Sequence, residues 1–159
     1  MKKIIMLALG FISLATIATA APAEKKFNVE NIFRLIVSDD INVILKDGPE
    51  GEITISGDKR LVSRVTYYSV NGVLIIKSKK GSLRNKVTVT VPVHNLQFLE
   101  VNDNCCVFTK GSIQSTMLNV KMKGEGRIDL KTIGQMVVEA DRDIDLIFDR
   151  FENRQQANK

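Results

Sequence analysis

Apolar and polar residues alternate with a period of two along most of the chain beyond residue 26. Between the alternating runs lie short segments rich in glycine, aspartate, asparagine and lysine, which are typical of turns. Because successive side chains on a strand point to opposite faces, this pattern predicts half-buried strands. We therefore expect an all-β domain, and its clearest strand sets are Phe33, Leu35 and Val37; Val43 and Leu45; Ile53 and Ile55; Leu74 and Ile76; Val87, Val89 and Val91.

Four nine-residue segments repeat one arrangement, with an apolar residue at the first and seventh places and mostly polar or small residues between them. They are 37–45, 101–109, 122–130 and 138–146. The last three begin 21 and 16 residues apart. At about 3.3 Å per extended residue, such spacings trace a loop of roughly 50 to 70 Å, the size of one coil of a solenoid. The sequence thus predicts a right-handed parallel β-helix or solenoid-like single domain with a less regular N-terminal half.

This alignment makes a specific prediction about the core. It places Ile128 and Ile144 at equivalent inward positions of neighbouring coils, about 4.8 Å apart. The residues that follow them, Asp129 and Asp145, should then face outward.

A Gly-x-Gly pair, Gly124 and Gly126, interrupts the third of these segments. A phosphate-binding glycine loop needs a strand before the glycines and a helix after them, so that the helix N-terminus meets the phosphate. The residues that follow, 127–134, alternate like a strand instead. We interpret the glycines as corner residues that allow a sharp bend between two short strands.

The first 20 residues predict a cleaved secretory signal peptide. Lys2 and Lys3 precede an apolar run over residues 4–18, and the small-x-small sequence at 18–20 follows. The run is shorter than the about 20 apolar residues that a membrane span needs, and no cysteine stands at the cleavage site for a lipoprotein anchor. We expect export to the periplasm, cell surface or extracellular space, with no transmembrane span after cleavage. The expected divisions are a signal peptide 1–20, a short segment 21–26, a solenoid-like domain 27–148 and a polar tail 149–159.

The charge of the chain argues against nucleic acid as a partner. The 159 residues carry a formal charge of +5, which becomes about +3 once Lys2 and Lys3 are removed with the signal peptide. One basic run contains no acidic residue. It either decorates an exposed loop and protects strand edges, or it binds an anionic glycan or lipid head group. Its members are Lys77, Lys79, Lys80, Arg84 and Lys86.

No familiar catalytic or zinc motif is present, and we expect neither enzyme activity nor a cofactor. The single histidine, His94, follows an expected strand and is interpreted as a surface residue at its end. Cys105 and Cys106 are adjacent, and neighbours on a strand face opposite sides, so we expect one in the core and one outside. A vicinal redox switch or an intermolecular bridge is the alternative. Two adjacent cysteines and one histidine cannot supply a structural zinc site.

Acidic residues gather in the expected coil corners. With the coils in register, the fourth-place residues Asn104, Glu125 and Asp141 stack on one edge, and Asp40 is placed to join them. Stacked oxygens could hold Ca²⁺, which takes about 6 to 8 oxygen ligands, so Asp40, Glu125 and Asp141 are the candidate metal ligands. The alternative is a solvated polar corner without any metal.

Five segments, taken in order, carry a resemblance to a known family: residues 39–48, 53–65, 70–80 and 87–101, and the Gly-x-Gly coil at 124–126. In this order they resemble the head GIN domain family of secreted bacterial proteins, described as auto-transporter adhesins with a β-helix-like fold. The family's Gly-Ile-Asn-like corner is here Asp40, Ile41 and Asn42. The resemblance implies secretion, a repetitive β architecture and an adhesive role.

We therefore expect a secreted, non-enzymatic binding or structural domain of the envelope or cell surface, with adhesin-like character. Its partner would be an envelope component or a glycan, and its oligomeric state is open. The alternative function is a small β-helix enzyme acting on polysaccharide, or a Ca²⁺-dependent glycan-binding module. A lyase of this kind would need an acid-lined groove with a central lysine or arginine, and three or four short coils offer little groove.

Overall fold

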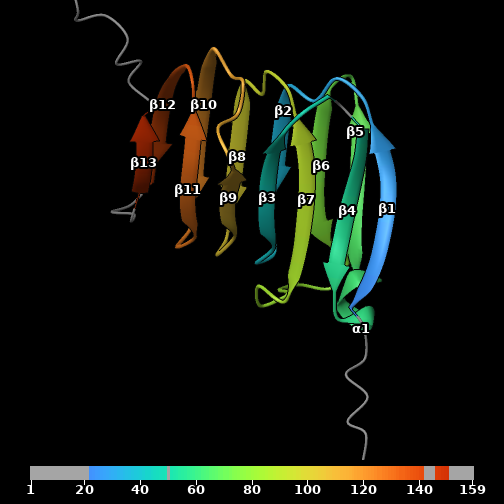
Figure 1. Ribbon diagram of the computed structural model, residues 1–159. Coiled ribbons are helices and arrows are strands. Elements are labelled where there is room, and N and C mark those ends of the chain that lie inside the picture. The colour runs from blue at the N-terminus through green and yellow to red at the C-terminus, as the bar shows by residue number, and fades with distance from the viewer. Residues whose placement is uncertain (1–21, 50, 142–145, 151–159) are drawn as a thin grey trace, which may run out of the picture.

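Two β-sheets face each other across one apolar core in the computed structural model (Figure 1). The structure describes residues 22–49 and 51–141, and the backbone of 146–150. The expected signal peptide and Ile144 lie outside these residues. The described chain is all-β, as the alternation predicts, apart from the short helix α1 (Lys59–Val62). Within this part of the chain, no helix is long and apolar enough to cross a membrane.

Both sheets are mixed, with parallel strands in the majority. The seven-stranded sheet contains, in spatial order, β1 (Ala23–Val29), β4 (Gly51–Gly57), β7 (Val87–Val93), β3 (Asn42–Asp47), β9 (Cys106–Lys110), β11 (Arg127–Thr132) and β13 (Leu146–Arg150). The six-stranded sheet contains β12 (Gln135–Ala140), β10 (Met117–Lys123), β8 (Phe98–Asn102), β2 (Arg34–Val37), β6 (Val73–Ser78) and β5 (Val65–Val70). Antiparallel pairing is confined to β1 with β4, β4 with β7 and β5 with β6 among the described strands.

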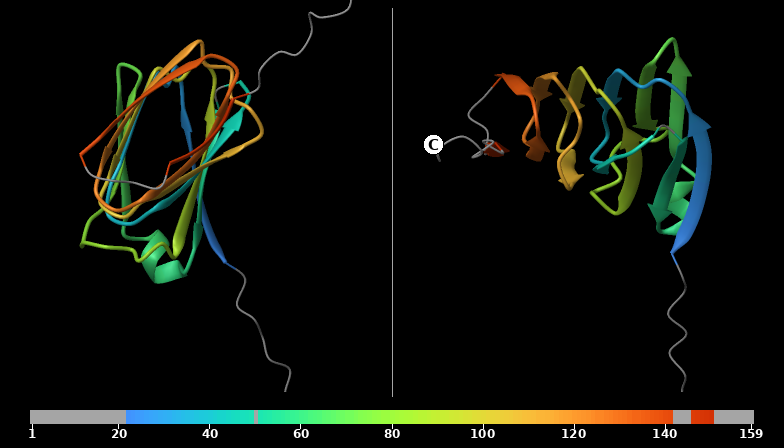
Figure 2. Two further views of the ribbon diagram at one scale, coloured as in Figure 1. Left: turned by 90° about the vertical axis from the view of Figure 1, so that its left-hand side faces the viewer. Right: turned by 45° about the horizontal axis from the view of Figure 1, so that its top comes forward.

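From β8 onward the chain passes from one sheet to the other and back, so that each coil lies parallel to the one before it (Figure 2). The strand register stacks the predicted anchor residues. Val101 pairs with Val37 on one side and with Met122 on the other. Ile128 pairs with Val107 of the preceding coil, and Val107 pairs with Val43 on its other side. The alignment of segments 37–45, 101–109 and 122–130 is therefore confirmed.

The fourth segment of that alignment is wrong by two residues. Ile128 pairs with Leu146 rather than with Ile144, and Val138 pairs with Val120. Because the side-chain period of a strand is two, a shift of two residues leaves every apolar side chain on its own face. The hydrophobic pattern alone therefore could not detect the error.

The coils do not follow one another in space as they do in the sequence. The coil of β2 and β3 lies between the coil of β6 and β7 and the coil of β8 and β9. Beyond β6 and β7, the antiparallel strands β1, β4 and β5 close the end of the stack. Phe27 of β1 stacks on Tyr67 of β5, with ring centroids 3.5 Å apart and planes inclined by 5°. Since β1 and β5 are edge strands of opposite sheets, this ring pair bridges the two sheets.

The alternating apolar residues build the core, as the pattern predicts. Each predicted set except the first is buried throughout, for example Ile53 and Ile55, which are 0% exposed. In the first set, Leu35 and Val37 are buried but Phe33 is 39% exposed. Phe33 precedes β2 and its ring lies over Gly72, where a Cβ atom would overlap the ring.

Gly124 and Gly126 form the corner between β10 and β11, as predicted. Gly124 has a φ of +129°, which side-chain-bearing residues rarely adopt, and a Cβ atom there would overlap the carbonyl oxygen of Asp103. A Cβ atom on Gly126 would overlap the carbonyl oxygen of Cys105. The glycines are thus needed for close contact with the preceding coil as well as for the bend. The strand β11 follows these glycines, whereas a phosphate-binding loop would need a helix at this place.

Candidate functional site

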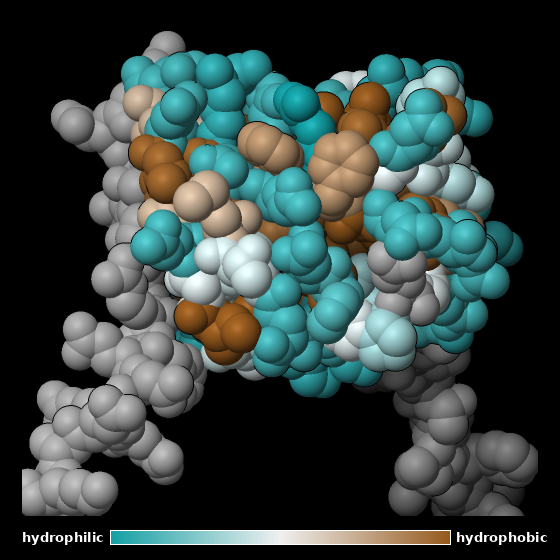
Figure 3. Space-filling model, turned by 90° about the horizontal axis from the view of Figure 1, so that it is seen from above, coloured by the Kyte–Doolittle hydropathy of each residue, from teal (hydrophilic) through white to brown (hydrophobic). Residues whose placement is uncertain are grey.

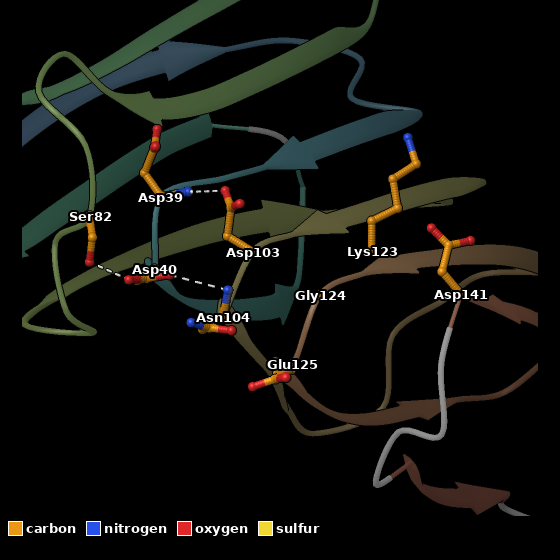
Figure 4. Close-up of a pocket in the computed structure, with 9 residues that line it drawn as sticks. All are labelled: Asp39, Asp40, Ser82, Asp103, Asn104, Lys123, Gly124, Glu125 and Asp141. Atoms are coloured by element: carbon orange, nitrogen blue, oxygen red, sulfur yellow. Dashed lines mark hydrogen bonds between the residues drawn. The ribbon is translucent and has the colours of Figure 1, made fainter.

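The corner acids line one hollow at the edge of the coil stack, which we call the corner hollow (Figure 4). It has a volume of about 610 Å³ and is lined by Asp39, Asp40, Ser82, Asp103, Asn104, Lys123, Gly124, Glu125 and Asp141. The candidate metal ligands Asp40, Glu125 and Asp141 therefore share one hollow with Asn104.

Three of these acids hold the backbone of the corner. The N–H of Asp39 donates to Asp103 Oδ2 at 2.9 Å. The N–H of Asn104 donates to Asp40 Oδ1 at 3.1 Å, and the hydroxyl of Ser82 donates to Asp40 Oδ2. Asp39, Asp40 and Asp103 all have positive φ angles, which aspartate tolerates better than most residues. The acids therefore join the corners of neighbouring coils.

The carboxylate of Asp40 is already engaged by hydrogen bonds of the corner, and binding of Ca²⁺ here stays a prediction to be tested. Both carboxylate oxygens of Asp40 accept hydrogen bonds from the protein. In Figure 4, Asp141 lies beside Lys123. Among residues 22–141, residue 50 excepted, no group of three or more histidine, cysteine, aspartate or glutamate side chains is arranged to hold a metal ion.

We expect the melting temperature to be the same in millimolar Ca²⁺ and in excess chelator. A cation that binds only the native chain would raise the melting temperature by linkage. Thermal unfolding followed by circular dichroism in both conditions is the measurement, with Glu125→Gln as the matched variant. A rise in Ca²⁺ that Glu125→Gln abolishes would contradict this expectation.

Lys123 is the basic residue that a lyase would need in the corner hollow. Its ammonium donates to Glu100 Oε1 at 2.8 Å, and this hydrogen bond and the charge of Glu100 raise the pKa of Lys123. A lysine with a raised pKa stays protonated at neutral pH and is a poor proton-abstracting base. The hollow therefore gives the lyase alternative no support.

The basic run lies at the end of β6 and on the loop to β7, and we call it the basic loop. The loop is anchored by Leu83, which is buried and whose N–H donates to the carbonyl of Asp39 at 2.9 Å. The guanidinium of Arg64 donates to carbonyl groups of the same loop, among them that of Gly81 at 3.1 Å. Binding of an anionic ligand here stays a prediction, carried by five exposed side chains: Lys77, Lys79, Lys80, Arg84 and Lys86.

The cysteines and the histidine lie where the sequence predicts. Cys105 is buried, its Sγ accepts the N–H of Ile41 at 3.4 Å, and Cys106 is half-buried; both are free thiols. Burial raises the pKa of the Cys105 thiol to about 12, so it is protonated and unreactive at neutral pH. His94 is exposed directly after β7.

A second hollow, which the sequence analysis missed, lies on the outer face of the six-stranded sheet. We call it the β8 groove; it has a volume of about 280 Å³ and is lined by Arg34, Phe98, Leu99, Glu100, Asn119, Val120, Lys121, Val137 and Glu139. One signal was present in the sequence. Phe98 and Val137 occupy outward places of alternating strands, where polar residues are usual, and they are 41% and 49% exposed.

The charged residues of the β8 groove form ion pairs, one of them with Lys123 of the corner hollow. Glu100 accepts from Lys123 Nζ at 2.8 Å and from Arg34 Nη2 at 3.2 Å. Lys121 Nζ and Glu139 Oε2 are 4.0 Å apart. The hydrogen bond from Lys123, supported by the one from Arg34, lowers the pKa of Glu100, so this carboxylate is ionised at neutral pH.

Solved structures with this fold come from bacterial proteins. A "putative adhesin" from Bacteroides fragilis has 16% identity and a TM-score of 0.62, with 79% of this chain and 61% of that chain covered. A "putative adhesin" from Parabacteroides merdae has 15% identity and a TM-score of 0.58, with coverage of 76% and 57%. A "putative lipid binding protein" from Parabacteroides distasonis has 12% identity and a TM-score of 0.51, with coverage of 82% and 68%. At these identities the likeness shows the fold alone, and the chain spans about three fifths of the length of the two adhesin structures.

The sequence comparisons agree with this fold. No curated protein matches the chain significantly. The family described as "Putative auto-transporter adhesin, head GIN domain" matches residues 33–143, which include both the corner hollow and the β8 groove. Because this match covers more than half of the sequence, the chain belongs to the head GIN domain family of adhesin-like proteins.

Proposed function

We propose that this protein is an exported, non-catalytic, adhesin-like module that binds a component of the envelope or of a cell surface. The observation that carries the proposal is the outer face of the six-stranded sheet. On it, the outward side chains of Phe98 and Val137 are 41% and 49% exposed, and both line the β8 groove. Contiguous or clustered apolar exposure on a folded domain is a common mark of a binding surface.

Other features of the molecule bear on the same function. On the face seen from above, apolar side chains form separate patches between polar ones (Figure 3). In the corner hollow, Asp40 and Asp103 accept backbone hydrogen bonds, and Lys123 is ion-paired with Glu100. Family membership favours adhesion over catalysis.

We also infer the export route and the chain organisation from the sequence. Residues 1–20 would direct secretion, 27–148 would form the binding domain and 149–159 a polar tail. The final location would be the periplasm, cell surface or extracellular space, without a lipid anchor. We infer that the coils wind in the right-handed sense that crossovers between parallel strands of one sheet almost always adopt.

We expect the purified protein to be retained on bacterial envelope fractions or on a glycan array. The measurement is the bound fraction in a pull-down, with heat-unfolded protein as the control for non-specific adhesion. Retention equal to that of the unfolded control on every surface would contradict the proposed function.

A further inference from the structure

We propose that the β8 groove binds an uncharged oligosaccharide, with one sugar ring stacked on the ring of Phe98. This inference rests on the proposed function and names its binding site and ligand class. The groove crosses β2, β8, β10 and β12, so a ligand in it would lie across the strands of the six-stranded sheet.

Phe98 supplies the apolar platform. It is 41% exposed, and the strand register places it between Arg34 on β2 and Asn119 on β10. The guanidinium of Arg34 lies 6.0 Å from the centroid of the Phe98 ring, which restricts the position of both groups. In the same row, Val137 of β12 pairs with Asn119 and extends the apolar surface. The C–H face of a sugar ring can pack on such a platform, because it is the apolar face of an otherwise polar molecule.

The charges of the groove favour a ligand without net charge. Among the residues that line the groove, the cations Arg34 and Lys121 balance the carboxylates Glu100 and Glu139. Lys123, which binds Glu100 from outside the lining, adds one positive charge nearby. A charged ligand would have to compete with these pairs. An uncharged polyol can instead add hydrogen bonds to paired carboxylates and ammonium groups without separating them.

The groove is also built on a rigid support. Leu99 and Val120, which line its floor, are 1% and 2% exposed and belong to the core. β8 and β10 are paired with parallel strands on both sides. The Nδ2 of Asn119 donates to the carbonyl of Gln97 at 3.4 Å, which holds the amide beside Phe98. A preformed site of this kind loses little conformational entropy when a ligand binds.

The test is calorimetric titration of the full-length protein with neutral hexasaccharides of glucose, mannose, galactose and N-acetylglucosamine. We expect at least one of them to bind, and Phe98→Ala to weaken that binding about thirtyfold, the effect of losing an aromatic anchor. Phe98→Tyr, which keeps the ring, should retain the affinity. Tyr68→Ala is the matched control, because it removes an exposed aromatic side chain of the same sheet that does not line the groove, and it should bind as the wild type does. Circular dichroism of each variant checks that it is folded.

Four results would overturn the inference. Retention on envelope fractions without binding of any neutral hexasaccharide would reject the ligand class and leave the proposed function intact. Binding restricted to polygalacturonate or to phosphatidylglycerol vesicles would assign a charged glycan or a lipid surface instead. Hexasaccharide binding that Phe98→Ala leaves unchanged would place the site elsewhere. Absence of binding to hexasaccharides and envelope fractions alike would reject both proposals.

Discussion

Gly124→Ala is expected to destabilise the protein by about 2–6 kcal/mol, the combined cost of an unfavourable backbone conformation and of overpacking. The φ of Gly124 is +129°, and a Cβ atom would lie too close to the carbonyl oxygen, the carbonyl carbon and the Cα of Asp103. These are backbone atoms of the preceding coil, so they cannot move aside as a flexible side chain could. Relief would require the corner between β10 and β11 to separate from the corner after β8.

Urea unfolding of the wild type and the variant measures this loss. Typical domains have a total stability of about 5–15 kcal/mol, so the variant should lose a large share of it. Gly51→Ala is the matched control, because the nearest atom to its added Cβ is the carbonyl oxygen of Pro49 at 3.9 Å, an ordinary contact. Equal unfolding midpoints for Gly124→Ala and Gly51→Ala would show that the coil corners are not closely packed.

Ile128→Ala should cost about 2–5 kcal/mol through lost burial and the cavity left behind. Ile128 is 0% exposed and pairs with Val107 on one side and with Leu146 on the other, so a strand flanks it on each side. The same urea unfolding experiment measures the loss.

Asp129, the residue after Ile128, provides the control for the Ile128→Ala experiment. Asp129 follows Ile128 on β11, is half-buried and faces the opposite side of the strand, so Asp129→Ala should change stability by less than about 0.5 kcal/mol. An effect of Asp129→Ala as large as that of Ile128→Ala would mean that the inward and outward faces of β11 have been exchanged.

The sequence determined the strands, the faces of their side chains and the corner role of Gly124 and Gly126. These features depend on neighbours within a few residues, and the period-two alternation reports them directly. It also predicted three of the four coil segments in register, and the burial of one cysteine beside a partly exposed one. The family resemblance rested on the same local segments and is confirmed.

The coil order and the last register were decided by the tertiary structure. The pattern of β2 and β3 is the same whether that coil lies before or after the coil of β6 and β7, because any coil with an apolar inner face can pack on any other. The shift that pairs Ile128 with Leu146 preserves the face of every residue, so it is set by the length of the corner segments and by backbone pairing.

The two hollows also depend on contacts between distant residues. Asp40 and Asn104, which hold the corner, are 64 residues apart, and Arg34 and Glu100 of the β8 groove are 66 apart. In the sequence alone, Asp40 is an acid that could bind a cation, and Phe98 is an apolar residue at an outward place with no sign of the charged residues around it. In the fold, the N–H of Asn104 donates to the carboxylate of Asp40, and Phe98 lies exposed among paired charges. Neighbouring strands of a parallel sheet come from distant parts of the chain, so local sequence does not report these contacts.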